Sequence, residues 1–518
     1  MLERFLKNSF NYWFFFILTG ILSFGFALTH SAMGIDDEIL ETWSQFYILL
    51  GLNRLGLFIT RKVLIANEYI PFLREFLFVL VYMFAINIYA KLFEENFPKI
   101  FTETAKIIYS CIMLTFPFVG FLFCFMDTNL EYGLSFLFSA IAIYYFYNSN
   151  LGNNKKKYII AFISLFISIS FYETGIIYFL MVVLAFSMFK IITNADKNKI
   201  GYDLVNSFLL FVASLFTNWC ILFFIRKILG FSKEERIYEL IKYNFSSINS
   251  LIISFKEIMV KFLNNFIETC RYDSASKIIL ISCFIFFLII IFYSIKINKK
   301  ILPIGIIFFL LPLVPLFLTG NYEFYYRVYS PYSIFCAISF VLLYTMLKKN
   351  NILRKIFLII VFFVVFSLIQ EINRIFYTEY LKFQNDRMFA YSLYQEVLKL
   401  GDKPLLIIGV KDNPKLNRNY YIEAPEINVS IFNWDRYDSF DSELFVNRPY
   451  AFMKEQGFEV KAYKDFVHFT KKEDYEDFIK EVSKISKAMT IYPKDGSIKD
   501  CGDFILIKIG KSKFDYNN

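Results

Sequence analysis

Histidine is nearly missing from this chain, and its cysteines lack the spacing of a metal or redox site. Only 2 of the 518 residues are His, and the 7 Cys form no CxxC pair. A histidine-rich or cysteine-rich metal centre is therefore not expected. The sequence also contains no Walker loop, no GxGxxG and no GxSxG, so nucleotide-binding and serine-hydrolase chemistry lack their usual motifs.

Apolar residues dominate instead. Hydrophobic residues make up 57% of the chain and aromatic residues 21%, with 67 Phe, and a soluble domain does not have this composition. Apolar runs long enough to cross a bilayer recur along the first two thirds of the sequence. They predict a polytopic α-helical membrane protein with about 11 transmembrane helices, at residues 10–29, 72–92, 107–126, 130–148, 158–171, 174–194, 205–225, 278–295, 301–318, 331–347 and 354–370.

The distribution of basic residues predicts the orientation of these spans. With the N-terminus inside, the cytoplasmic segments carry 18 Lys and Arg, whereas the three short outer loops carry only Arg327. This asymmetry follows the positive-inside rule and places every residue after 370 outside. The net charge of +9 therefore reflects membrane topology, and we expect no nucleic-acid partner.

The last 148 residues predict a small exported domain. A helix is expected over 371–400, and short apolar runs predict strands at 404–409, 488–492 and 504–509. We therefore divide the chain into a membrane domain, 1–370, and a C-terminal α/β domain, 371–518. A further helix is expected over 251–270, either flat on the outer leaflet or packed against the spans.

Three consecutive acids, Asp36, Asp37 and Glu38, follow the first span on the predicted outer side. Adjacent carboxylates near lipid oppose one another's ionisation, which raises their pKa toward the range useful for a general base. Asp36 or Asp37 could then accept a proton from a sugar hydroxyl during group transfer. The alternative is that these acids cap an interfacial helix.

Other charged residues are predicted on the same side. Arg54 and Arg61 lie in the same loop and could bind a phosphate leaving group, or hold the loop at the lipid headgroups. Glu173 and Arg327 each occupy a short outer turn. Tyr326 belongs to a tyrosine cluster that could form an aromatic belt or a sugar-stacking surface.

The chain resembles the bacterial glucosyl transferase type II family, which modifies O-antigen and belongs to the lipid-linked, multi-spanning C-type glycosyltransferases. Six short motifs carry this resemblance, in order, from about residue 30 to 510: Gly34-Ile35-Asp36-Asp37, Leu52-Asn53-Arg54-Leu55-Gly56, Phe171-Tyr172-Glu173, Tyr326-Arg327-Val328, Phe383-Gln384-Asn385-Asp386-Arg387 and Tyr492-Pro493-Lys494-Asp495-Gly496-Ser497. The chain has Asn53 where the family has Gly, Leu55 where it has Trp and Glu173 where it has Gln.

The resemblance implies a bacterial inner-membrane enzyme whose active site faces the periplasm or the outside. The donor would be an undecaprenyl-phosphate sugar, glucose favoured, and the acceptor a lipid-linked or O-antigen-type glycan of the surface polysaccharide or lipopolysaccharide. Asp36 or Asp37 would be catalytic in an inverting displacement. Substrate or phosphate contacts would come from Glu38, Arg54, Arg61, Glu173, Tyr326 and Arg327. A divalent metal could bridge acids and phosphate, but no ligand set in the sequence requires one.

Two other functions compete with this interpretation. One is a transporter or flippase for the same lipid-linked glycans, and the other is an assembly protein whose working part is the exported tail. Transporters usually place ionisable residues near the bilayer midplane, whereas all 22 acids before residue 371 lie in loops or at span edges. This pattern favours the enzyme.

Overall fold

The structure is a computed structural model of the whole chain. It describes residues 10–34, 53–63, 72–126, 128–149, 154–194, 200–230, 247–272, 274–319, 326–411, 427–433, 448–463 and 472–511. The chain forms two compact units. The first, which we call the helical unit, comprises residues 1–31 and 44–376, and the second, the sheet unit, comprises residues 32–43 and 377–518.

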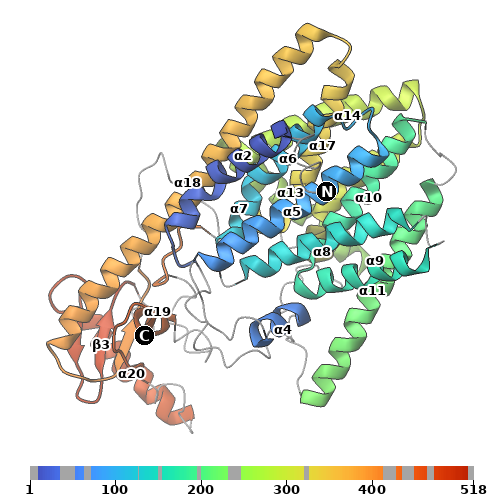
Figure 1. Cartoon of the computed structure of the whole chain (residues 1–518). Helices are drawn as coiled ribbons and strands as arrows, with labels where there is room; N and C mark the ends of the chain where they lie inside the picture. Colours follow the sequence, from blue (N-terminus) through green and yellow to red (C-terminus); the bar gives the residue numbers. More distant parts are fainter. Residues whose placement is uncertain are drawn as a thin grey trace. The chain divides into compact units, whose positions relative to one another are not determined.

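The helical unit is built from helices that follow the apolar runs of the sequence (Figure 1). Helices α5, α8, α9 and α11 pack in succession, each on the next. The helical elements are α2 (Phe10–Thr29), α4 (Leu55–Val63), α5 (Leu73–Asn96), α6 (Glu103–Thr115), α7 (Pro117–Phe123), α8 (Asn129–Asn148), α9 (Lys155–Phe171), α10 (Thr174–Ile192), α11 (Ile200–Leu229), α13 (Ile248–Tyr272), α14 (Ser274–Lys296), α15 (Ile301–Leu310), η3 (Leu311–Leu313), α16 (Val314–Thr319), η4 (Tyr326–Tyr329), α17 (Tyr332–Leu347) and α18 (Asn351–Leu398).

Within the described part of the chain, nine helical segments are long and apolar enough to cross a membrane. A tenth is obtained if α6 and α7, bent by 46° at their junction, count as one span. The predicted span at 158–171 corresponds to α9, which has 17 residues. The chain is thus a multi-pass helical membrane protein, while the count of eleven and the orientation stay predictions.

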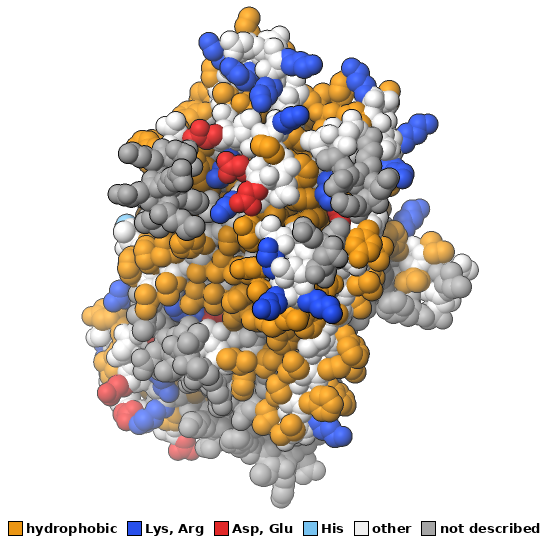
Figure 2. Space-filling view, turned by 45° about the vertical axis from the view of Figure 1, so that its right-hand side comes forward, with side chains coloured by type: hydrophobic (Ala, Val, Ile, Leu, Met, Phe, Trp, Pro, Cys, Tyr) orange, Lys and Arg blue, Asp and Glu red, His pale blue; other side chains and the backbone are white. Residues whose placement is uncertain are grey.

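Burial separates central from peripheral helices. In α10 and in the segment that contains α17, 78% of the span residues are buried, against 22% in α11. Peripheral helices expose large apolar side chains, among them Phe216 and Phe284. Figure 2 shows hydrophobic side chains over a large part of the face that it presents. Such a surface suits lipid, which solvates apolar side chains as well as a protein core does.

The sheet unit contains three short strands. Strand β1 (Leu405–Ile408) pairs in parallel with β3 (Ile505–Lys508), and β2 (Ile498–Asp500) pairs antiparallel with β3, so the order is β1-β3-β2. Two further helices, α19 (Arg448–Glu455) and α20 (Lys472–Ala488), belong to this unit together with the C-terminal part of α18.

Both faces of this sheet are covered. Side chains of a strand alternate between faces, so Leu405 and Ile407 pack with Ala390 and Leu393 of α18, whereas Leu406 and Ile408 pack with Val482 of α20. The continuous apolar runs in β1 and β3 are explained by this two-sided burial.

The prediction of a strand at 488–492 is wrong. Helix α20 continues to Ala488, and the segment after it forms a turn in which Thr490 Oγ1 donates a hydrogen bond to the Asp495 carbonyl (2.6 Å). The Tyr492 N–H still donates to the Lys508 carbonyl of β3 (2.9 Å), but Pro493 follows with no N–H for a ladder, so the regular strand beside β3 forms after this turn, as β2. The strands predicted at 404–409 and 504–509 are confirmed as β1 and β3.

Two predicted helices differ in extent from the sequence expectation. The span at 354–370 and the helix at 371–400 form one continuous helix, α18, of 48 residues. The helix predicted at 251–270 is confirmed as α13, whose Phe262 ring lies 5.8 Å from the Tyr329 ring. One face of α13 is therefore packed, while Ile252, Ile253 and Ile267 on it are exposed.

Candidate functional site

Four of the predicted site residues fall within the described residues of the helical unit, namely Arg54, Glu173, Tyr326 and Arg327. Arg61 lies on α4, but its side chain is outside the described set. The acidic triplet Asp36, Asp37 and Glu38 also lies outside the described residues, so its catalytic assignment stays a prediction.

Arg54 lies against Tyr172 at one end of the helices. Its guanidinium carbon is 5.3 Å from the centroid of the Tyr172 ring, a cation–π distance. The Tyr172 ring in turn lies 4.4 Å from that of Tyr132, in the first turn of α8. These contacts bring together three segments of the chain, around residues 54, 132 and 172.

Glu173 and Arg327 act on Arg54 electrostatically. Burial alone would lower the pKa of the Arg54 guanidinium, but the Glu173 carboxylate together with Tyr132 and Tyr172 outweighs it, and the pKa lies above its ordinary value. Arg327 is also close enough to oppose this rise. Glu173 itself is exposed at the start of α10. The structure thus brings Arg54, Glu173 and Arg327 together, as a shared outer compartment predicted.

The Arg54 guanidinium has a hydrogen-bond donor without an acceptor among the described residues. Its Nε is buried and has no hydrogen-bond partner among the described residues. A guanidinium carries five N–H donors in a planar fork that matches two phosphate oxygens. The predicted phosphate contact of Arg54 needs such a donor, and that role stays a prediction.

Close backbone packing positions Arg54. A Cβ atom on Gly56 would lie 2.7 Å from Ser170 Oγ and 2.8 Å from Phe171 Cδ1, so only glycine lets the start of α4 approach the end of α9 this closely. Asn53 has a φ of 65°, in the left-handed region that Gly adopts freely and Asn better than most other residues. Asn53 therefore preserves the backbone that the family's Gly would provide.

The turn that carries Tyr172 and Glu173 is held by serine hydroxyls. Ser135 Oγ on α8 donates to the carbonyl of Ser168 or Tyr172, each 3.0 Å away. Ser168 Oγ donates back to the Ser135 carbonyl (2.8 Å), and Ser139 Oγ to that of Gly175 (2.9 Å). Small hydroxyl residues allow close helix packing in membranes, and here they fix the turn between α9 and α10.

Arg327 and Tyr326 lie on η4, before α17. The Arg327 guanidinium lies 4.3 Å from the centroid of the Phe125 ring. The Tyr326 ring stacks on Phe121 at 4.5 Å, and the residue is 3% exposed. Arg327 is therefore held against Phe125 and the Tyr326 ring is used in packing, and a ligand contact for Arg327 stays a prediction. A direct substrate contact for Tyr326 stays a prediction.

A buried ion pair at the same end of the helices as Arg54 was not predicted from the sequence. Arg74 in the first turn of α5 donates to Glu131 in the first turn of α8 (2.7 Å), and both side chains are almost fully buried. Glu75 is also buried. Because Glu131 immediately precedes Tyr132, this pair fixes α8 beneath the Tyr172 contact. The available signal was a charged residue at the edge of two apolar runs, Arg74 in one and Glu131 in the other.

The described residues contain no group of three or more His, Cys, Asp and Glu that could hold a metal ion. The acidic triplet lies outside the described residues. The prediction from the sequence, that a divalent metal could bind but is not required, therefore stays a prediction.

A methyl group at position 56 should disturb the site without removing any charge. We expect Gly56→Ala to shift the start of α4 away from Ser170 and Phe171, and so to move Arg54 off Tyr172. The KM for a phosphate-bearing donor should rise about tenfold, because small displacements of a binding group are costly. The matched control is Gly201→Ala, since nothing lies within 4 Å of a Cβ at Gly201. Equal KM values for the two variants would contradict this account of the packing.

Comparison with known families now adds to this geometry. A family model described as Glucosyl transferase GtrII matches residues 25–346, more than half of the chain. No curated protein and no solved structure was found to match. The matched region includes Asp36, Asp37, Arg54, Glu173 and Arg327, whereas the motifs at 383–387 and 492–497 lie beyond it. This chain belongs to the GtrII glucosyl transferase family.

Proposed function

We propose that this protein transfers a hexose, glucose favoured, from an undecaprenyl-phosphate sugar to a lipid-linked or O-antigen-type surface glycan. The transfer takes place on the outer face of the bacterial cytoplasmic membrane. The observation that carries the proposal is the cluster of Arg54, Tyr172, Glu173 and Arg327 at one end of the helices. Two arginines and an aromatic surface suit a phosphate joined to a sugar.

The proposed reaction is a single inverting displacement. An acceptor hydroxyl attacks the anomeric carbon while Asp37 or Asp36 takes its proton, and the bond from that carbon to the phosphate oxygen breaks. The electron pair of that bond leaves with the polyprenyl phosphate. Arg54, assisted by Arg327, offsets the negative charge that develops on this leaving group.

The buried charges favour an enzyme over a carrier. Before residue 371, the buried charged side chains of the described residues lie in the first or last turns of helices, as with Arg74, Glu131, Asp203 and Arg226. Proton-coupled carriers instead use ionisable groups or broken helices near the midplane. The excess of basic residues in the predicted cytoplasmic segments supports an outward-facing site.

The test is an in vitro screen with the full chain in membranes or lipid nanodiscs. A panel of undecaprenyl-phosphate hexoses is offered with lipid-linked surface glycan, and transfer is followed by the mass of the product. We expect one hexose to be added per acceptor site, with release of undecaprenyl phosphate and a preference for glucose. Transfer only from a sugar nucleotide would overturn the donor assignment. Translocation of the glycan without any change in its mass would favour a flippase.

A further inference from the structure

The segment just before the acidic triplet belongs to the sheet unit and not to the helical unit that surrounds it in sequence. Residues 32–43 group with 377–518, although helix α2 ends only at Thr29. Met33 is 8% exposed and forms part of the hydrophobic core that includes Leu405, Ile505 and Phe452. The chain therefore passes through the C-terminal unit immediately before it reaches Asp36.

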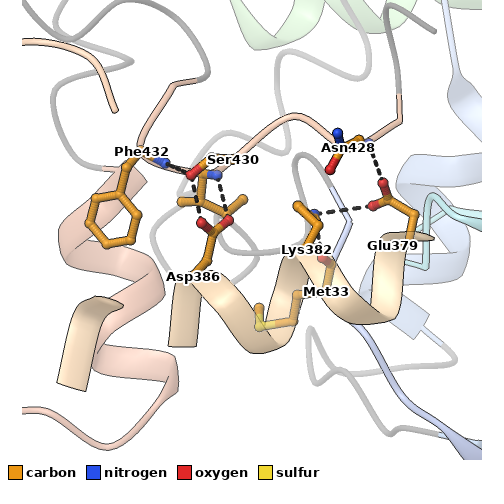
Figure 3. A network of polar contacts seen from close by, with 8 residues as sticks. Met33, Glu379, Lys382, Asp386, Asn428, Ser430 and Phe432 are labelled. Carbon is orange, nitrogen blue, oxygen red and sulfur yellow. Dashed lines mark hydrogen bonds and ion pairs between the residues drawn. The ribbon is translucent and has the colours of Figure 1, made fainter. Parts of the chain in front are cut away.

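A buried lysine holds this segment by its backbone. Lys382 on α18 donates from Nζ to the Met33 carbonyl oxygen (2.9 Å) and pairs with Glu379 (3.1 Å), with its own side chain fully buried (Figure 3). Gln456 Nε2 donates to Met33 Sδ (3.4 Å). Glu379 is held in turn by the Asn428 N–H, at 2.6 Å from its Oε1. Backbone and side chain of Met33 are thus both fixed.

Burying a lysine is costly and needs compensation. Removing an ammonium from water is unfavourable unless opposite charge and hydrogen-bond acceptors replace the solvent. Glu379 supplies the opposite charge, and the Met33 carbonyl supplies an acceptor that is 349 residues away in sequence. An apolar side chain at position 382 would fill the same space without this cost. Compared with an apolar side chain, Lys382 adds a hydrogen bond that fixes the position of residue 33.

We propose that Lys382 is a positioning residue for the acidic triplet, so that the C-terminal unit takes part in the transfer reaction by setting the place of the general base. This proposal rests on the function proposed above. Asp36 is the third residue after Met33, and three extended residues span at most about 11 Å. A general base must lie within hydrogen-bond reach of the acceptor hydroxyl. A displacement of residue 33 would therefore lower the rate of the transfer step.

A second buried pair in the same unit provides a matched control. Lys411 pairs with Asp386 (2.9 Å), whose carboxylate also accepts hydrogen bonds from Ser430 Oγ (2.6 Å) and the Ile431 N–H (2.9 Å). Figure 3 shows Asp386 on the same helix as Lys382. Lys411→Met therefore removes a largely buried ammonium from the sheet unit and leaves the hydrogen bond to Met33 in place.

The experiment compares Lys382→Met with Lys411→Met in the full chain, using the donor that is active with the wild type. We expect Lys382→Met to lower kcat about 10- to 100-fold, while the KM for the donor stays within about twofold. Lys382→Arg should recover part of the loss. Lys411→Met should keep kcat within about threefold. Because Lys382→Met leaves Glu379 unpaired, E379Q/K382M serves as a second variant without a buried unpaired carboxylate.

A double-mutant cycle separates positioning from a merely structural role. If Lys382 acts through the acid, adding Lys382→Met to the more damaging of Asp36→Asn and Asp37→Asn should cause no further loss of kcat. Additive losses would overturn the proposal, and so would wild-type kcat in a folded Lys382 variant. An inactive wild type would instead count against the proposed function. Limited proteolysis of each variant establishes that the sheet unit is folded.

Discussion

Asp37→Asn, or Asp36→Asn if that residue is the base, should lower the rate of sugar transfer by about 10²- to 10⁴-fold. The amide has nearly the same shape as the carboxylate but cannot take the proton of the acceptor hydroxyl. The attacking oxygen would then develop positive charge, and the barrier would rise. The measurement is kcat for each single variant with a saturating undecaprenyl-phosphate sugar.

The affinity for the donor should change little in these variants, because the arginines are assigned to the phosphate. Asp402→Asn is the control, since Asp402 is an exposed acid whose side chain pairs with Lys461 at 2.8 Å on the sheet unit. It should transfer sugar at the wild-type rate. Wild-type rates in both Asp36→Asn and Asp37→Asn would remove the two acids from the mechanism.

Arg54→Met should lower kcat/KM by about 10²- to 10³-fold, the loss typical of removing one preorganised donor to a developing negative charge. The methionine fills similar space against Tyr172 but supplies neither charge nor N–H groups. Arg54→Lys should recover only part of the loss, because an ammonium cannot bind two phosphate oxygens in a fork. Both kcat and KM should be affected, since the phosphate is charged in the bound donor as well.

The control for Arg54 is Arg354→Met. Arg354 is exposed near the start of α18, and its Nη2 lies 2.6 Å from Asn351 Oδ1. Its replacement removes the same charge and should leave transfer unchanged. If Arg54→Met retains the wild-type kcat/KM, the phosphate must be held by other groups, and Arg327 is the next residue to replace.

Much of the helical unit could be predicted because a lipid environment leaves a strong signal in the sequence. Runs of about 20 apolar residues form helices at the expected places, and the turns predicted on the outer side bring Glu173 and Arg327 close to Arg54. The continuity of α18 was harder to see. Glu371 and Arg374 end the apolar run, yet they form an ion pair along the helix, with Glu371 buried, and do not interrupt it.

Contacts between distant segments could not be predicted from the sequence. No periodicity connects Lys382 with Met33, or Gly56 with Ser170, because these pairs depend on how separate elements pack. The prediction of a strand at 488–492 was wrong for a related reason. Its apolar residues suit a strand, but α20 extends to Ala488 and a turn follows, so the third strand formed further along. The acidic triplet lies outside the described residues, and its role stays a prediction.

The serine hydroxyls between α8, α9 and α10 have a consequence for how this enzyme could change its substrate. Because Ser135, Ser139 and Ser168 bond to backbone carbonyls, the Tyr172–Glu173 turn loses little conformational entropy when a donor binds. Under the proposed function, a turn that is rigid in advance would recognise the part that all polyprenyl-phosphate donors share. New sugar preferences should therefore evolve through side chains outside this turn, and exchanging the turn between relatives should leave the choice of hexose intact.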